Sequence, residues 1–191
     1  MVIMQNIYSN VKQNGSTMLE VLITIVILAL GLLGLAGLQS RLQVSEMEAY
    51  QRSQALILLN DMASRITTNR NVAVSYITAS AQGAGMVCPT ALTTQKDRDM
   101  KEWCSALQGS AETIGASSVG AMVGGRGCVE SLGGGQFMVT VAWQGLVPIS
   151  APPTSVTCGQ NNYNSSVTGA VCVSELCRRV VTTVVQIGTL S

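Results

Sequence analysis

The sequence predicts an α+β chain in which one long N-terminal helix packs against a small antiparallel β-sheet in a C-terminal head. An apolar run of 18 residues extends from Val21 to Leu38, and the stretch that follows it contains no Pro or Gly as far as Arg70. Two segments near the C-terminus alternate apolar and polar residues and are rich in β-branched side chains. Together these patterns predict one long helix followed by strands.

The apolar run is long enough to cross a membrane once, over about residues 18–38. At 1.5 Å per residue, its 18 residues span about 27 Å, close to the hydrocarbon thickness of a bilayer. A secretory signal peptide is the alternative, with Gly34-Leu35-Ala36 as a small-x-small cleavage site. The run exceeds the usual apolar length of about 7–15 residues, and Lys12 is the only basic side chain before it, so a retained membrane helix is favoured.

Three glycines, Gly31, Gly34 and Gly37, fall at three-residue spacing inside the run. Each costs about 1 kcal/mol of helix stability relative to alanine. They could allow close helix packing or local bending, or they could be ordinary transmembrane glycines. The sequence leaves both interpretations open.

The helical pattern continues beyond the apolar run. Between Gln39 and Arg70, apolar residues recur at roughly helical spacing among polar ones. A helix from about Thr17 to Arg70 would be about 80 Å long, and its second half would carry an apolar stripe that needs a partner. The stripe comprises Leu42, Met47, Tyr50, Leu58, Met62 and Ile66.

The head is predicted to contain one short helix and at least two strands. Asp97 to Gln108 has charged residues in its first turn, apolar residues on one side and Gly109 as a stop signal, so a helix is expected there. The other expected elements are an irregular connection over 71–96, a weaker strand over 127–130, firm strands over 136–143 and 178–187, and a loop over 147–170.

Cysteine usage indicates an oxidising compartment. The six cysteines all follow the apolar run, and their even number favours structural disulfides, for which 15 connectivities are possible. A thiolate metal site is the alternative, but the chain has no His and no Cys-x-x-Cys. We therefore expect disulfides, no metal, and a C-terminal side outside the cytoplasm. The disulfide candidates are Cys88, Cys104, Cys128, Cys158, Cys172 and Cys177.

The usual catalytic and nucleic-acid-binding patterns do not occur. Charged residues are 11% of the chain and the net charge is +1, so no nucleic-acid partner is expected. The glycine-rich pieces at 124–127 and 133–135 lack the Lys-Ser/Thr ending of a phosphate loop and are interpreted as turns. Without His or a Gly-x-Ser-x-Gly context, the chain is not expected to be an enzyme or to hold a cofactor. Arg178 and Arg179 are interpreted as a solvated strand end.

The stretch Gly15-Ser16-Thr17-Met18-Leu19-Glu20 resembles the processing site of class III signal peptides in type IV prepilins. This resemblance implies that a dedicated prepilin peptidase and methyltransferase cuts after Gly15 and methylates the new N-terminal amine of Ser16. The chain would then divide into a leader (1–15), an N-terminal helix (16–70) and a globular periplasmic head (71–191). The fold implied is the type IV pilin fold.

Further residues are similar to minor pilins of the PilV type. They are "GLLGLAGLQ" (31–39), "AYQRSQA" (49–55) and "DMASRITTNR" (61–70), with weaker likeness in "VAWQG" (141–145) and "CRRVV" (177–181). Two departures matter: Ser16 replaces a common Phe at a tolerant position, and Gly37 stands where many major pilins carry a kinking Pro. The second departure favours a less sharply bent helix.

Glu20 has two compatible interpretations. In the family, the corresponding Glu is thought to meet the N-terminal amine of a neighbouring subunit during assembly, which implies a pairing of Glu20 with Ser16 of an adjacent pilin. Thr17-Met18-Leu19-Glu20 also fits a capping box, and the helix dipole favours a negative charge there.

The resemblance implies a minor pilin that takes part in type IV pilus assembly or initiation. Its partners would be other minor and major pilins, the prepilin peptidase and the inner membrane, which the chain would cross once before entering the pilus. The alternative is a pseudopilin of a type II secretion system. A third class, a singly anchored periplasmic enzyme or binding module, predicts an uncut N-terminus or cleavage after Ala36.

Overall fold

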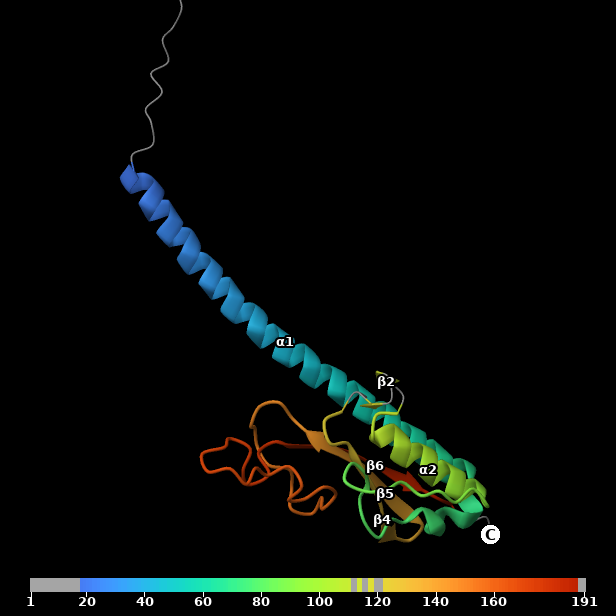
Figure 1. The fold of residues 1–191 in the computed structure, drawn as a ribbon. Coiled ribbons are helices and arrows are strands. Elements are labelled where there is room, and N and C mark those ends of the chain that lie inside the picture. Colours follow the sequence, from blue (N-terminus) through green and yellow to red (C-terminus); the bar gives the residue numbers. More distant parts are fainter. Residues whose placement is uncertain (1–17, 111–112, 115–116, 119–121, 189–191) are drawn as a thin grey trace, which may run out of the picture. The chain divides into compact units, whose positions relative to one another are not determined.

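A computed structural model describes residues 18–110, 113–114, 117–118 and 122–188 (Figure 1). The chain divides into two compact units, Met1–Gln43 and Val44–Ser191. The first unit contributes the N-terminal part of one helix, and the second contributes the rest of that helix and the head. Each unit is described by itself.

Helix α1 extends from Met18 to Thr68 over 51 residues. Glu20 in its first turn and Arg65 in its last turn both complement the helix dipole. The helix ends two residues before the predicted Arg70. A 3₁₀-helix, η1 (Arg70–Tyr76), follows, so the prediction of an irregular connection was wrong for this part.

The remaining connection contains the two-residue strand β1 (Gln82–Gly83) and leads into helix α2 (Gln95–Leu107). Helix α2 begins two residues before the prediction because Thr94 is its N-cap. The Thr94 side chain accepts from the Asp97 amide and the Asp97 carboxylate accepts from the Thr94 amide, which is a capping box. Gly109 has a φ of 83° just after the helix, as a helix-ending glycine should.

The sheet is antiparallel with the order β1-β4-β5-β6. Its long strands are β4 (Arg126–Gly133), β5 (Gln136–Gln144) and β6 (Arg178–Gln186). The left-handed glycines Gly133, Gly134 and Gly135 make the turn from β4 to β5, which confirms a turn at this glycine-rich piece. A separate two-stranded sheet joins β2 (Thr113–Ile114) and β3 (Ser117–Ser118).

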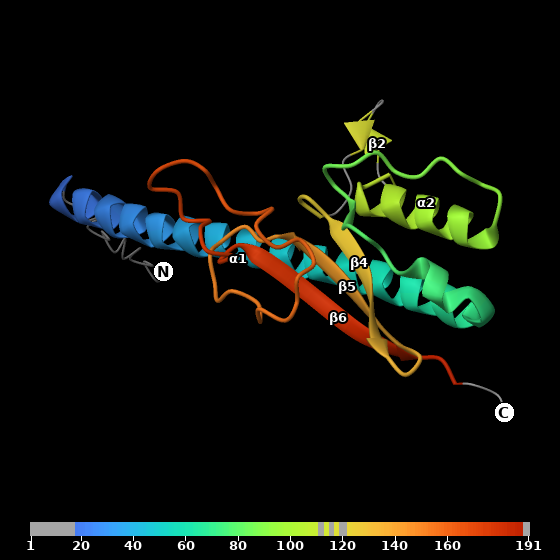
Figure 2. The same ribbon diagram turned by 90° about the horizontal axis from the view of Figure 1, so that it is seen from below.

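The C-terminal part of α1 lies along one face of the sheet, which confirms the predicted α+β class (Figure 2). Alternate residues of β5 face this helix together with Trp103 and Leu107 of α2. A side chain at Gly127 would overlap the Trp103 ring, so glycine lets α2 pack closely on β4. The buried β5 residues in this core are Phe137, Val139, Val141 and Trp143.

The apolar stripe of α1 is only partly the predicted one. Met62 and Ile66 are buried as expected, whereas Leu42, Met47 and Tyr50 are exposed and Leu58 is half-buried. The buried side of the helix instead comprises Gln51, Ala55, Leu59, Met62 and Ile66. These positions follow the spacing of one helix face, and the sheet selects that face.

All six cysteines form disulfides in the structure, within the head. Cys88–Cys104 ties the segment before α2 to that helix, and Cys128–Cys158 ties β4 to the long loop between β5 and β6. Cys172–Cys177 closes a short turn just before β6. The disulfides therefore hold the parts of the head that have the least regular structure.

Candidate functional site: the N-terminal segment and the polar contacts of the head

Glu20 lies in the first turn of α1, two residues after the helix begins. Its side chain is exposed, as are the apolar residues around it. The first turn leaves backbone N–H groups without helical partners, so a carboxylate there is favoured by the helix dipole. Gly15, Ser16 and Thr17 lie outside the described residues, so the cleavage site and the Thr17 cap remain predictions.

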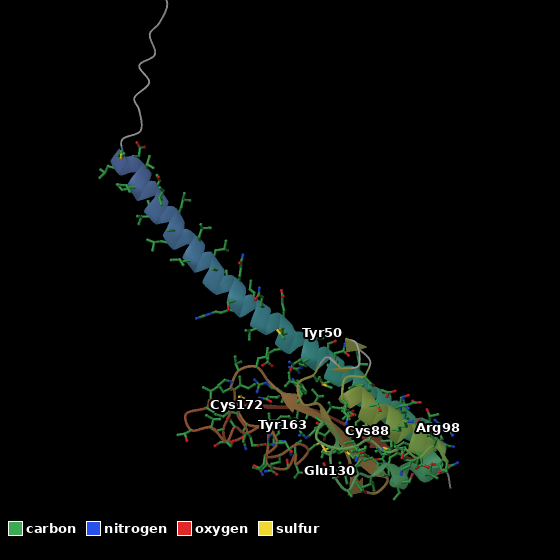
Figure 3. The ribbon with its side chains drawn as sticks, in the orientation of Figure 1. Tyr50, Cys88, Arg98, Glu130, Tyr163 and Cys172 are labelled. Carbon is green, nitrogen blue, oxygen red and sulfur yellow. A yellow bond between two sulfur atoms is a disulfide. The ribbon has the colours of Figure 1, made fainter. Side chains whose placement is uncertain are left out.

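The N-terminal part of α1 exposes apolar side chains on every side (Figure 3). Met18 is 86% exposed and Leu33 71%, and the most apolar 18-residue window of the helix has none of its residues buried. A stretch of this length and composition can cross a membrane. Such a surface needs lipid or other helices to cover it.

The three glycines of this segment face open space. A Cβ atom added at Gly31, Gly34 or Gly37 would meet nothing within 4 Å. Their small size is therefore not required by any contact within the described chain. Both interpretations of these glycines, close helix packing or bending and ordinary transmembrane glycines, therefore stay predictions.

The prediction that Arg178 and Arg179 form a solvated strand end was wrong. Arg178 is 2% exposed, and its Nη1 donates to the carbonyls of Val156 and Cys158 at 2.8 and 3.1 Å. It also forms an ion pair with Glu175. The loop between β5 and β6 folds back over the start of β6. The Arg178 guanidinium fixes this loop by hydrogen bonds to the backbone carbonyls of the loop.

Arg179 holds a different part of the head. Its side chain is 10% exposed, donates to the carbonyl of Val147 at 2.6 Å, and lies 3.4 Å from a carboxylate oxygen of Glu48 on α1. Glu48 also accepts from the Leu146 amide at 2.7 Å. Glu48 and Arg179 therefore join α1, the start of β6 and the loop after β5.

A polar network joins α1, η1 and α2 and was not predicted from the sequence. Arg65 of α1 contacts three carboxylates, those of Asp61, Asp99 and Glu102, at 3.0, 2.9 and 2.8 Å. Burial acts to lower the pKa of Arg65, but the hydrogen bonds to these carboxylates outweigh it and raise the pKa above its ordinary value. The charge of Arg65 is therefore secure at any physiological pH.

Tyr76 completes this network from η1. Its hydroxyl donates to the buried Asp99 and accepts from the side-chain amide of Asn69 at 2.9 Å. Burial, followed by the hydrogen bond to Asp99, raises the pKa of Tyr76 to about 12. The network joins two helices and the 3₁₀ turn, and the hydrogen bonds among its members offset the cost of burying their polar and charged groups.

A groove of about 600 Å³ lies at one end of the sheet, between residues 45–52 of α1, the loop residues 149–153 and the start of β6. Arg52, Glu48 and Arg179 line it together with Trp143 and two prolines. Within the described residues no group of three or more His, Cys, Asp or Glu side chains could hold a metal ion.

The comparisons with known proteins match only the N-terminal segment. Residues 10–36 match the family described as the prokaryotic N-terminal methylation motif. This range contains the predicted cleavage site, Ser16, Glu20 and the first part of α1. No curated protein and no solved structure matches the chain.

Proposed function

We propose that this chain, which carries the N-terminal methylation motif of type IV pilin-like proteins, is a minor pilin of the PilV type. The observation that carries the proposal is the position of the motif. It ends within the exposed apolar part of a 51-residue helix, and the same helix then packs on a small antiparallel sheet. A processed precursor that keeps its apolar helix needs this arrangement, because the helix must first sit in lipid and later among other helices.

In this proposal, prepilin peptidase cuts after Gly15 on the cytoplasmic side and the amine of Ser16 is methylated. The apolar helix holds the chain in the inner membrane as a single pass, with the head, residues 71–191, in the periplasm. Three disulfides in the head support an oxidising compartment. On assembly, the helix exchanges lipid for neighbouring pilin helices, at little cost because both surroundings are apolar.

Glu20 has the assembly role in this proposal. A carboxylate at the edge of the bilayer costs less than one at its centre but still favours a cationic partner. Its exposed position in the first turn of α1 leaves it accessible to the methylated Ser16 amine of a neighbouring pilin. The Glu20 carboxylate would therefore serve both as a cap of the helix N-terminus and as the partner of that amine.

A Glu20→Ala variant tests the assembly role. We expect normal leader cleavage and membrane insertion but a loss of the chain from sheared pili, with Glu46→Ala, on the exposed part of the same helix, as the matched control. Cleaved Glu20→Ala that enters pili at the wild-type level would contradict the role.

A deletion strain separates a pilus from a secretion system. The minor-pilin proposal expects fewer or no surface pili with normal secretion of exported enzymes. Normal piliation with loss of a secreted enzyme would instead assign the chain as a pseudopilin of a type II secretion system.

A further inference from the structure

The loop between β5 and β6 (145–177) contains strained backbone. Among the described residues, three that are not glycine have left-handed φ angles: Asn161 at 63°, Ser174 at 52° and Glu175 at 66°. All three lie in this loop. A left-handed L residue is destabilised because its Cβ comes too close to the following carbonyl oxygen, an effect that Asn tolerates best. Such residues persist where the surrounding structure fixes them, and they concentrate at functional sites and switches.

The Glu175 side chain joins the strained turn at 174–175 to the strained Asn161. Its Oε1 accepts from the backbone amide of Asn161 and from the side-chain amide of Asn164, both at 2.9 Å. The Glu175 amide donates to Oδ1 of Asn164 at 2.8 Å. The other carboxylate oxygen forms the ion pair with Arg178. The turn therefore positions a carboxylate that fastens the middle of the loop.

The Cys172–Cys177 disulfide closes this turn around both of its left-handed residues. We call the closed segment the latch turn. Its backbone makes two further bonds to the loop: the Cys172 carbonyl accepts from the Ser165 amide at 2.7 Å, and the Leu176 carbonyl accepts from the Ile149 amide at 2.8 Å. The long loop is thus fastened at several points to one disulfide-closed segment.

Other contacts fasten the first part of the loop to the sheet independently of the latch turn. The Cys128–Cys158 disulfide joins it to β4. The Tyr163 hydroxyl donates to the Gly124 carbonyl at 2.8 Å, just before β4 begins. Figure 3 labels Tyr163 and Cys172, which lie in this loop. Opening the latch turn would therefore free residues 164–176 while the first part of the loop stays attached.

One sulfur of the latch disulfide can be reached by an attacking thiol. Cys172 is half-buried, and its neighbours Val171 and Val173 are 64% and 40% exposed. Cys177 is 1% exposed and is therefore shielded. Because thiol–disulfide exchange requires direct attack on a sulfur atom, the reaction is directed to Cys172.

The other two disulfides lack this combination of strain and exposure. Cys128 and Cys158 are both buried, at 7% and 2% exposed. Cys88 is half-buried, but its disulfide with Cys104 encloses mostly helix α2 and no left-handed residue. Strained and exposed disulfides are the ones that thiols reduce most readily.

We propose that Cys172–Cys177 is a redox latch: a dithiol opens it ahead of the other two disulfides, and residues 164–176 then lose their order while the sheet stays folded. A thiolate of the dithiol attacks Sγ of Cys172, and Sγ of Cys177 leaves as a thiolate. The second thiolate of the dithiol attacks its own sulfur in the mixed disulfide, which releases the Cys172 thiolate and closes the dithiol to a disulfide. Two electrons and two protons thereby pass from the dithiol to the two cysteines.

Reduction changes the order of the loop because the closed turn holds Ser174 and Glu175 in the left-handed region. In the open turn both residues relax to negative φ, and the Glu175 carboxylate leaves Asn161 and Asn164. The latch uses residues of the head alone. It therefore stands or falls independently of the proposed function.

Controlled reduction of the detergent-solubilised full chain tests the latch. The protein is equilibrated over a series of reduced-to-oxidised dithiothreitol ratios, free thiols are alkylated, and peptide mass spectrometry reports the state of each cysteine pair. We expect alkylation of Cys172 and Cys177 at ratios at which Cys88–Cys104 and Cys128–Cys158 are still intact. Reduction of either other disulfide before this one, or together with it, would overturn the proposal.

A matched pair of variants tests whether strain makes this disulfide reducible. Ser174→Gly removes the Cβ from a left-handed residue, so the closed turn is less strained and half-reduction should need about a threefold higher dithiothreitol ratio. Ser166→Gly makes the same change at an exposed residue of the loop that is not left-handed, and it should leave the ratio unchanged. An equal ratio for the two variants would contradict the role of strain.

Cleavage by glutamyl endopeptidase measures the order of the loop, because Glu175 is the only acidic residue between positions 145 and 177. Its side chain is 13% exposed in the closed turn, so cleavage after it should be slow, and about tenfold faster once the latch alone is reduced. The fluorescence of the buried Trp103 and Trp143 should stay native at that ratio. Unchanged cleavage would overturn the release of the loop, and loss of native fluorescence would show that the whole head unfolds, which would overturn the latch.

Discussion

Replacement of Arg65 by methionine should destabilise the head strongly, because three carboxylates share this cation. Asp99 matters most: its side chain is 5% exposed and lies 2.9 Å from Arg65, whose side chain is 23% exposed. Removing one partner of a buried ion pair costs about 3–5 kcal/mol. Asp99 keeps its hydrogen bonds from Tyr76 and Gln95, so we expect the lower end, about 3 kcal/mol.

The other two carboxylates contribute little to this figure. Glu102 is 61% exposed and Asp61 is 37% exposed, so each pair is worth about 0.5 kcal/mol or less. Glu102→Gln is therefore the matched control, since it removes the carboxylate charge from a contact of similar length, 2.8 Å against 2.9 Å for Asp99, at an exposed position.

The assay is urea denaturation of the detergent-solubilised full chain, with its disulfides intact, followed by tryptophan fluorescence. Trp103 is fully buried beside this network and Trp143 nearly so, which makes the signal sensitive to loss of the core. If Arg65→Met lowers the free energy of unfolding no more than Glu102→Gln does, the network does not stabilise the head and the reasoning is refuted.

Three further predictions concern the head. Gly127→Ala should lower the free energy of unfolding by about 1–3 kcal/mol, because the added methyl group would overlap the Trp103 ring. Gly188→Ala, which has open space around it, is the control and should be nearly neutral. Equal free energies of unfolding for the two variants would contradict this packing. Replacing both Cys128 and Cys158 by serine should lower the free energy of unfolding by about 3.5 kcal/mol, against about 2 kcal/mol for the same change at Cys172 and Cys177. The first disulfide costs more to lose because it joins residues 30 apart in sequence, whereas the second joins residues 5 apart. Thermal unfolding should give the lower melting temperature for the Cys128/Cys158 variant, and the reverse order would contradict the loop-closure reasoning. Tyr76 is neutral in the fold and its pKa is raised from 10.0 to about 12, so its contribution is present below about pH 10 and is lost as the pH rises through about 12. The free energy of unfolding should fall over roughly pH 10–12 less steeply in Tyr76→Phe than in the wild type, and identical slopes would exclude this origin.

The regular elements were predictable because their signals are local. Strands β5 and β6 alternate apolar and polar residues with β-branched side chains, and Gly109 marks the end of α2. The N-terminal motif could also be identified from the sequence alone, because residues 10–36 match a known family model by sequence.

The buried face of α1 was harder to predict because Ala55 to Leu59 is apolar almost all round the helix. Periodicity alone cannot choose one face from such a run, and the sheet makes the choice by covering Ala55 and Leu59. The buried Gln51 on the same face is a polar residue that no apolar pattern would select.

Arg178 and the Arg65 network depend on contacts between segments far apart in the chain. Arg178 is buried by a loop whose glycines, prolines and asparagines carry no periodic signal, and Arg65 meets Asp99 across 34 residues of sequence. The place of β6 at one edge of the four-stranded sheet likewise follows from strand order, which the sequence of one strand does not contain.

The intact mass of the mature chain from the membrane fraction tests the central claim most directly. The account predicts a chain that begins at Ser16, carries one added methyl group at its N-terminus, and retains the whole of α1 with three disulfides in the head. A chain that keeps its first 15 residues, or that begins after Ala36, would contradict it.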